Sequence, residues 1–186
     1  MTQPTTIPNH VIKMIVAAAL MGFAGIMSET AMNVTFPKLS VIFGVSMEKL
    51  AWVTTIYLLM VAIMMTLSAY LRRRFSERTL FLASVSIFVA GILLGGAATA
   101  FPVLLVGRVF QGIAAGIALP LTFNIILEEV PLAKLGTWMG IGSLVVSIAP
   151  SIGPTYGGLL VDTLGWRAIF FFDADFGGYL IGIRNQ

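Results

Sequence analysis

Long stretches without a charged residue are the feature that most constrains how this chain can fold. Residues 50–71, 79–107 and 135–161 contain no charged side chain. A helix needs about 20 predominantly apolar residues to cross a hydrocarbon core of about 30 Å. Such runs are too long for the strands of a water-soluble domain and lack the polar face of its surface helices. We therefore predict an all-α, polytopic transmembrane helix bundle.

The composition agrees with this prediction. Hydrophobic residues make up 58% of the chain and charged residues only 10%, against roughly 25% charged residues in average soluble domains. The absence of cysteine excludes a disulfide scaffold. A net charge of +3 is too small to suggest nucleic acid as a partner. We expect the lipid bilayer as the surroundings and no cofactor.

Charges and prolines divide the chain into five spans and a weaker sixth. The run 79–107 is too long for one helix, and Pro102 lies where it should break. The last segment carries Asp173 and Asp175, which predict a poor membrane span or, alternatively, an ion site. A signal peptide is the alternative for the first segment. We expect a cytoplasmic segment 1–13 and a transmembrane domain 14–186, with spans at about 14–36, 50–71, 79–99, 103–127, 135–161 and 168–183.

The distribution of Lys and Arg predicts the orientation. Cytoplasmic connections carry an excess of basic residues. With the N-terminus inside, the cytoplasmic positions are Lys13, Arg72, Arg73, Arg74, Arg78 and Lys134, and the outer ones are Lys38, Lys49 and Arg167. We therefore predict a multi-pass protein of the plasma membrane with a cytoplasmic N-terminus, in which the cluster 72–78 is at least an anchor.

Two charged residues fall inside confident spans, Glu29 in the first and Arg108 in the fourth. A charge at the bilayer centre costs about 2.5–3.5 kcal/mol on insertion scales, so such residues usually face a partner or a water-filled pathway. Helical spacing puts Asn33 on the face of Glu29 and Gln111 on the face of Arg108. One interpretation is structural, with the two charges snorkelling or satisfying each other. The other is a substrate and proton pathway formed by these four residues.

Small residues four positions apart predict close contacts between helices. They occur as Gly91 and Gly95, Gly112 and Gly116, Gly136 and Gly140, Ser143, Ser147 and Ser151, and Gly153 and Gly157. Pro150 and Pro154 each remove a backbone donor from the fifth span and favour a kink. A kinked helix with a glycine face suits a moving transporter, and simple tight packing is the alternative.

Three motifs resemble the major facilitator superfamily. GRVFQGIAAGIALPL (107–121) resembles its fourth-helix motif, and PSIGPTYGG (150–158) resembles the fifth-helix antiporter motif. SETAMNVTFP (28–37) is similar to the first-helix signature of the fourteen-helix drug:proton antiporter branch, the EmrB/QacA type. WVTTIYLLMVAI and WRAIF also fit that branch.

The resemblance implies an N-terminal half of the superfamily fold, proton-coupled multidrug efflux, and hydrophobic, cationic small molecules and protons as partners. Arg108 matches the fourth-helix arginine, and Glu29 falls one residue from the usual first-helix acid. The antiporter helix motif is matched by Pro150, Gly153, Pro154, Gly157 and Gly158.

The connection between the second and third spans departs from the family pattern. It reads AYLRRRFSER, with Arg73 in place of an acid and Ser76 in place of a glycine. The basic residues of this cytoplasmic loop motif are Arg72, Arg73, Arg74 and Arg78.

Family members carry fourteen helices, more than this chain offers. We therefore expect a truncated N-terminal part that needs the missing C-terminal half or a related full-length transporter. The alternative is an inert or regulatory membrane fragment. An enzyme is not expected, since His10 is the only histidine and no nucleophile–base pair is visible.

Overall fold

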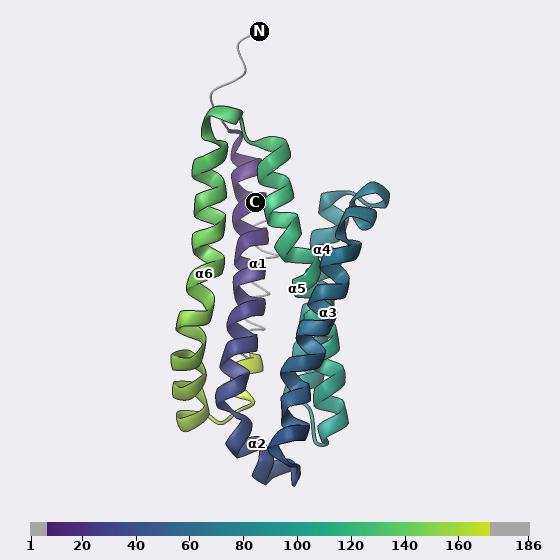
Figure 1. Ribbon diagram of the computed structural model, residues 1–186, viewed down its shortest axis with the longest axis vertical. Coiled ribbons are helices and arrows are strands. Elements are labelled where there is room, and N and C mark those ends of the chain that lie inside the picture. The colour runs from purple at the N-terminus through teal and green to yellow at the C-terminus, as the bar shows by residue number, and fades with distance from the viewer. Residues whose placement is uncertain (1–6, 172–186) are drawn as a thin grey trace.

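The computed structural model describes residues 7–171 of the chain. These residues form α1 (Asn9–Val34), α2 (Phe36–Phe43), α3 (Met47–Arg74), α4 (Glu77–Gly96), α5 (Phe101–Glu129) and α6 (Leu132–Thr163). Five of these helices, all except α2, are long and apolar enough to cross a membrane. Figure 1 shows the long helices side by side, with α2 at one end. The described part of the chain therefore confirms the all-α helix bundle.

Helix α1 extends beyond the predicted span 14–36 at its N-terminal end. It begins at Asn9, so His10 and Lys13 belong to the helix. Pro37 lies in the first turn of α2, where its missing N–H would be unpaired in any case. The expected break at Pro102 is found, because α5 begins at Phe101.

Only the start of the weaker sixth span lies in the described part of the chain. Residues 168–171 are helical. The rest of the span 168–183, with Asp173 and Asp175, lies outside the described residues.

The helices are arranged around α1 and α5. Helix α5 packs against α1, α3 and α4, and α1 packs against α6, so α6 and α3 lie at the two sides of the bundle (Figure 1). Both side helices keep large apolar residues exposed, among them Leu58 and Ile63 of α3 and Leu144 and Ile152 of α6. Such surfaces are expected to face lipid or another part of a larger bundle.

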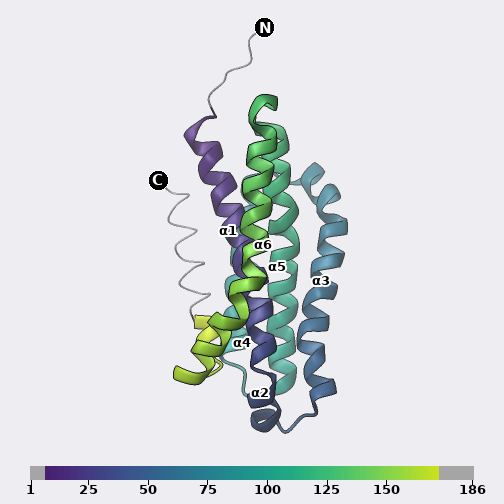
Figure 2. The ribbon, with the colours of Figure 1, turned by 60° about the vertical axis from the view of Figure 1, so that its left-hand side comes forward.

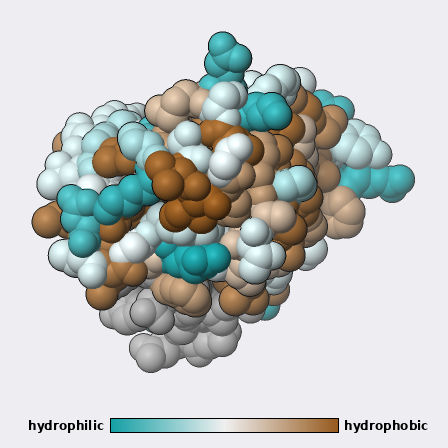
Figure 3. All heavy atoms as spheres, turned by 90° about the horizontal axis from the view of Figure 1, so that it is seen from below, coloured by the Kyte–Doolittle hydropathy of each residue, from teal (hydrophilic) through white to brown (hydrophobic). Residues whose placement is uncertain are grey.

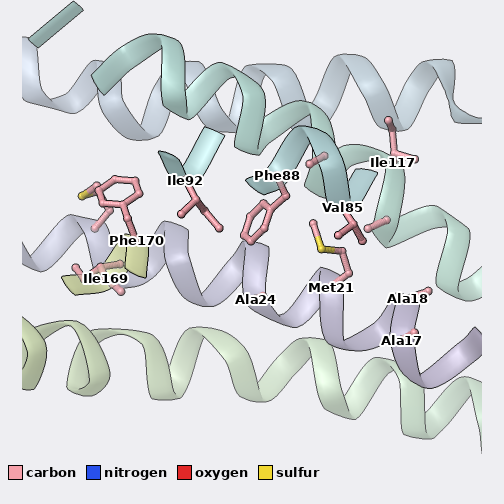
Figure 4. Packing of buried hydrophobic residues seen from close by; sticks show 14 of the residues in the cluster. Ala17, Ala18, Met21, Ala24, Val85, Phe88, Ile92, Ile117, Ile169 and Phe170 are labelled. Carbon is pink, nitrogen blue, oxygen red and sulfur yellow. The ribbon is translucent and has the colours of Figure 1, made fainter. Parts of the chain in front are cut away.

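The core between α1 and α4 is built from large apolar side chains. Val85, Phe88 and Ile92 of α4 lie opposite Met21 and Ala24 of α1 (Figure 4), and all five are at most 1% exposed. Lipid is as apolar as these side chains, so the helices are held together by van der Waals contact rather than by the hydrophobic effect.

Glycines allow three pairs of helices to approach closely. A Cβ atom on Gly107 would lie 2.8 Å from the backbone nitrogen of Gly95, where α5 meets α4. One on Gly116 would lie 2.8 Å from the Val61 carbonyl oxygen of α3, and one on Gly157 would lie 2.6 Å from the Ala31 carbonyl oxygen of α1. The close contacts predicted for Gly91 and Gly95, Gly112 and Gly116, and Gly153 and Gly157 are confirmed.

For the first half of α6 the predicted close contact is not made within the described part of the chain. Apart from the neighbouring backbone of α6 itself, no described atom lies within 4 Å of a Cβ built on Gly136 or Gly140. Ser143, Ser147 and Ser151 are exposed, and the Ser147 hydroxyl donates to the Ser143 carbonyl oxygen of its own helix at 2.8 Å. Gly153 and Gly157 lie on a different face of α6, and it is this face that meets α1.

The bundle has two different ends. The α2 end holds α2 and the α4–α5 connection, and the N-terminal end holds the α3–α4 and α5–α6 connections (Figure 1). Figure 3 looks onto the α2 end and shows polar side chains spread among apolar ones. In the predicted orientation the α2 end faces the outside.

Two cations bind carbonyl groups where helices finish at the α2 end. Arg167 donates to the carbonyl oxygens of Gly96 and Ala98, at 3.1 Å and 2.9 Å, after the last turn of α4. Lys38 Nζ donates to the Val161 carbonyl oxygen at 2.9 Å and to Asp162 Oδ1 at 2.8 Å, at the end of α6. Carbonyls at a helix C-terminus have no partner within the helix, and positive charge there is favourable.

Candidate functional site

Arg108 of α5 is enclosed by its own helix and α3. It is 0% exposed. Its Nη1 donates to Gln111 Oε1 at 2.9 Å, its Nε donates to the Val53 carbonyl oxygen at 3.4 Å, and its guanidinium carbon lies 4.3 Å from the centre of the Tyr57 ring. Charged hydrogen bonds and a cation–π contact offset part of the cost of burying a cation.

The sequence of α5 explains why α3 comes so close to Arg108. A Cβ atom on Gly112 would lie 2.9 Å from Met60 Cβ and 3.2 Å from Tyr57 Cα. Only a glycine leaves room for α3 at this distance. The close approach lays the Tyr57 ring against the guanidinium one turn away.

Glu29 of α1 begins a second polar chain, which crosses to α3. Asn33 Nδ2 donates to Glu29 Oε1 at 3.3 Å, and Thr54 Oγ1 donates to Asn33 Oδ1 at 2.5 Å. Glu29 is partly exposed and Asn33 is exposed. The acid therefore reaches the surface of the described bundle, whereas Arg108 does not.

Tyr57 and Thr54, one turn apart on α3, connect these two groups. Thr54 binds the α1 chain, and Tyr57 lies over Arg108. The Tyr57 hydroxyl also approaches α1, since it lies 3.1 Å from a Cβ built on Gly25. We call the six residues Glu29, Asn33, Thr54, Tyr57, Arg108 and Gln111 the polar junction.

The structure thus brings the four sequence-predicted residues into one junction and adds two that the sequence analysis missed. A signal for Thr54 and Tyr57 was available. They are polar-ended residues three positions apart in an uncharged span, which places them on one helix face.

Two buried polar groups near the junction have no hydrogen-bond partner among the described residues. They are the Ser28 hydroxyl and Gln111 Nε2. An unsatisfied buried polar group costs about 1–3 kcal/mol, and groups of this kind in a native fold need an explanation. Because these two groups lie beside Glu29 and Arg108, this region lowers the free energy of unfolding of the bundle.

The antiporter helix motif lies on α6, next to the segment that carries Glu29. Gly153 and Gly157 face α1, and a Cβ on Gly153 would collide with the Thr30 hydroxyl and lie 3.1 Å from the Met27 carbonyl oxygen. Pro150 and Pro154 are exposed, and α6 stays helical through both. Figure 2 shows the axis of α6 bending in its second half.

Gly158, the last residue of that motif, makes a looser contact. A Cβ there would lie 4.0 Å from Val34 Cγ1. A shift of α6 would therefore press first on residues 27–31 of α1, which include Glu29.

The cytoplasmic loop motif lies at the N-terminal end, away from the polar junction. Arg72 forms an ion pair with Glu128 of α5. Arg73, Arg74 and Arg78 are exposed. Of the four arginines, Arg72 thus ties the end of α3 to the end of α5.

Residues 18–180 match the sequence profile of the Major Facilitator Superfamily. The chain belongs to this family. The family and its matched relatives are membrane transporters rather than enzymes.

Relatives named as multidrug export proteins and as lincomycin resistance proteins support the EmrB-type branch. The lincomycin resistance protein LmrB of Listeria monocytogenes is 40% identical over 163 residues, which cover 87% of this chain and 35% of the relative. The multidrug export protein EmrB of Escherichia coli is 32% identical over 164 residues, 88% of this chain and 32% of the relative. The chain thus spans about a third of the length of these relatives.

A solved structure confirms the fold. The crystal structure of a D-xylose-proton symporter superposes with a TM-score of 0.80 at 16% identity, over 96% of this chain and 48% of that protein. At this identity the likeness concerns the fold alone. The described bundle therefore has the architecture of the N-terminal portion of a superfamily transporter.

Proposed function

We propose that this chain is the N-terminal part of a proton-coupled multidrug exporter of the plasma membrane, with its N-terminus in the cytoplasm. The multidrug export and lincomycin resistance proteins among its relatives support the choice of efflux. The activity requires the second half of the transporter, supplied by a C-terminal half or by a related full-length protein. Alternating access needs two bundles that move around a shared site.

Glu29 carries the proton in this proposal. As a carboxylate it accepts the hydrogen bond from Asn33 and attracts a cationic substrate. When a proton binds, the oxygen loses its charge, so the bond from Asn33 and the attraction for a cation both weaken. Exchange of a cationic, hydrophobic drug for a proton follows, because the two compete for one carboxylate.

Arg108 supplies the fixed charge of the site. Its guanidinium stays protonated at any physiological pH, and its contacts with Gln111 and Tyr57 hold it in place. Tyr57 and Thr54 both belong to α3. A movement of α3 against α5 therefore changes the surroundings of Arg108 and the hydrogen bonds from Thr54 to Asn33 and from Asn33 to Glu29 at the same time.

The observation that carries this proposal is the polar junction itself, in which a partly exposed acid and an enclosed arginine share neighbouring residues of α3. The test is export of a cationic dye, ethidium, by cells that express the complete transporter containing this sequence. Glu29→Gln keeps the shape of the side chain and removes its charge, so we expect at least a tenfold loss of export.

Glu48→Gln is the matched control, because Glu48 is an exposed acid at the same end of the bundle. We expect it to export at the unmodified rate. Normal ethidium export by Glu29→Gln at equal expression would refute the role proposed for Glu29.

A further inference from the structure

A cavity of about 450 Å³ opens at the N-terminal end of the bundle between α1, α4 and α5. Ala17 is the residue of α1 that lines it nearest the bundle centre. It lies roughly 18 Å along the helix from Glu29. The cavity is therefore separate from the polar junction.

The lining of the cavity changes from polar to apolar with depth. On α1, His10, Lys13 and Ala17 share one helix face, and the first two are exposed while Ala17 is 2% exposed. On α4, Arg78 is exposed, but Phe81, almost a turn deeper, is 7% exposed. Met14 and Ile125 complete the apolar floor. The cavity thus has a charged mouth and an apolar floor.

The charge at the mouth is positive. Lys13 and Arg78 contribute two cations, and His10 contributes a further polar ring. Glu77 is the one acid among the described lining residues, and Arg72 and Glu129, which carry opposite charges, both lie within electrostatic range of it. Among the described lining residues the two cations therefore outnumber the one acid.

We propose that this cavity binds one anionic phospholipid from the adjacent leaflet, the cytoplasmic leaflet in the predicted orientation. The headgroup phosphate lies between Lys13 and Arg78, and an acyl chain lies over Phe81 and Ile125. Basic pockets between transmembrane helices at the cytoplasmic side suit anionic headgroups. A free phosphate ion would contact the cations at the mouth but would make no apolar contact with the floor. A phospholipid makes both kinds of contact, so the cavity favours a lipid.

Native mass spectrometry of the delipidated 186-residue chain tests this proposal, with dioleoylphosphatidylglycerol as the probe and dioleoylphosphatidylcholine as the neutral comparison. We expect one saturable phosphatidylglycerol site. The double variant Lys13→Gln/Arg78→Gln should weaken it by roughly tenfold or more, because each surface cation contributes to anionic lipid binding. Arg73→Gln/Arg74→Gln is the matched control, since it removes two exposed cations at the same end that do not line the cavity, and it should keep the affinity.

A second variant tests the floor. Ala17→Trp places a large ring in the buried part of the cavity and should abolish saturable phosphatidylglycerol binding, with folding checked by the thermal unfolding midpoint. If Ala17→Trp does not fold, the comparison of the two double variants tests the proposal by itself. Equal weakening by the two double variants, equal binding of both lipids, or displacement of phosphatidylglycerol by millimolar inorganic phosphate would each overturn the proposal. Unchanged binding by a folded Ala17→Trp protein would do so too.

Discussion

The two ends of the bundle are held in different ways. At the α2 end, Arg167 and Lys38 bind the final carbonyls of α4 and α6 from distant parts of the chain. Trp166 packs there edge-on against Phe43 and Phe170, with ring centres 5.7 Å and 6.1 Å apart. At the N-terminal end, the Arg72–Glu128 ion pair lies beside an open cavity.

The same difference runs along α6. Its half near the α2 end meets α1 through Gly153 and Gly157, whereas Gly136 and Gly140 meet no other helix within the described part of the chain. We call the α2 end the fastened end of the described bundle, and the bend of α6 lies in the half near it (Figure 2). The polar junction lies toward the fastened end.

Gly157→Ala should have the largest effect on stability. The added methyl would lie 2.6 Å from the Ala31 carbonyl oxygen and 2.8 Å from Ala31 Cα, and a backbone cannot yield as a side chain can. We expect a loss of about 2–3 kcal/mol, the upper part of the usual cost of overpacking. The measurement is the thermal unfolding midpoint in detergent, followed by tryptophan fluorescence.

Gly136→Ala is the matched control in the same helix. Its methyl meets no described atom within 4 Å beyond the neighbouring backbone of α6, and alanine is favoured over glycine in a helix by roughly 0.5–1 kcal/mol. The thermal unfolding midpoint of Gly136→Ala should equal or exceed that of the unmodified chain. Equal destabilisation by both variants would remove the distinction between the two halves of α6.

Arg167→Ala should have the next largest effect. It removes two charged hydrogen bonds to the carbonyls of Gly96 and Ala98, together with the contact between the guanidinium and the Trp166 ring. Hydrogen bonds to charged groups contribute about 1.5–3 kcal/mol, and the exposure of Arg167 places the loss near the lower value. Arg74→Ala, at the other end, should leave the midpoint within experimental error, and an equal fall would contradict the assignment of the fastened end.

Lys38→Met should have the smallest effect. The Lys38–Asp162 pair is largely exposed, with side-chain exposures of 48% and 78%, and exposed ion pairs contribute at most about 1 kcal/mol. The difference from the unmodified chain should shrink as salt is added. A loss as large as that of Arg167→Ala, unaffected by salt, would contradict this order and would assign the main effect to the bond from Lys38 to the Val161 carbonyl oxygen.

The sequence was sufficient for the helices and for part of the site. Uncharged runs predicted the five long helices, and helical spacing paired Glu29 with Asn33 and Arg108 with Gln111. Both pairs are hydrogen-bonded in the structure. These features depend on neighbours three or four positions away in one helix.

Contacts between helices were not predictable in the same way. Thr54 and Tyr57 gain their importance from α1 and α5, and Arg167 from the end of α4. Gly136 and Gly157 belong to similar motifs, but among residues 7–171 only the latter faces a neighbouring helix. The spacing of residues along the sequence shows which side chains share a helix face. It does not show which neighbouring helix packs on that face.

The most direct test of the central claim is the pH change that substrate drives in proteoliposomes containing the complete transporter. With Glu29→Gln, the account predicts that a cationic substrate no longer moves protons, whereas Glu48→Gln moves them at the unmodified rate. A normal substrate-driven pH change by the Glu29→Gln protein would contradict the account, because the proton would then be carried elsewhere.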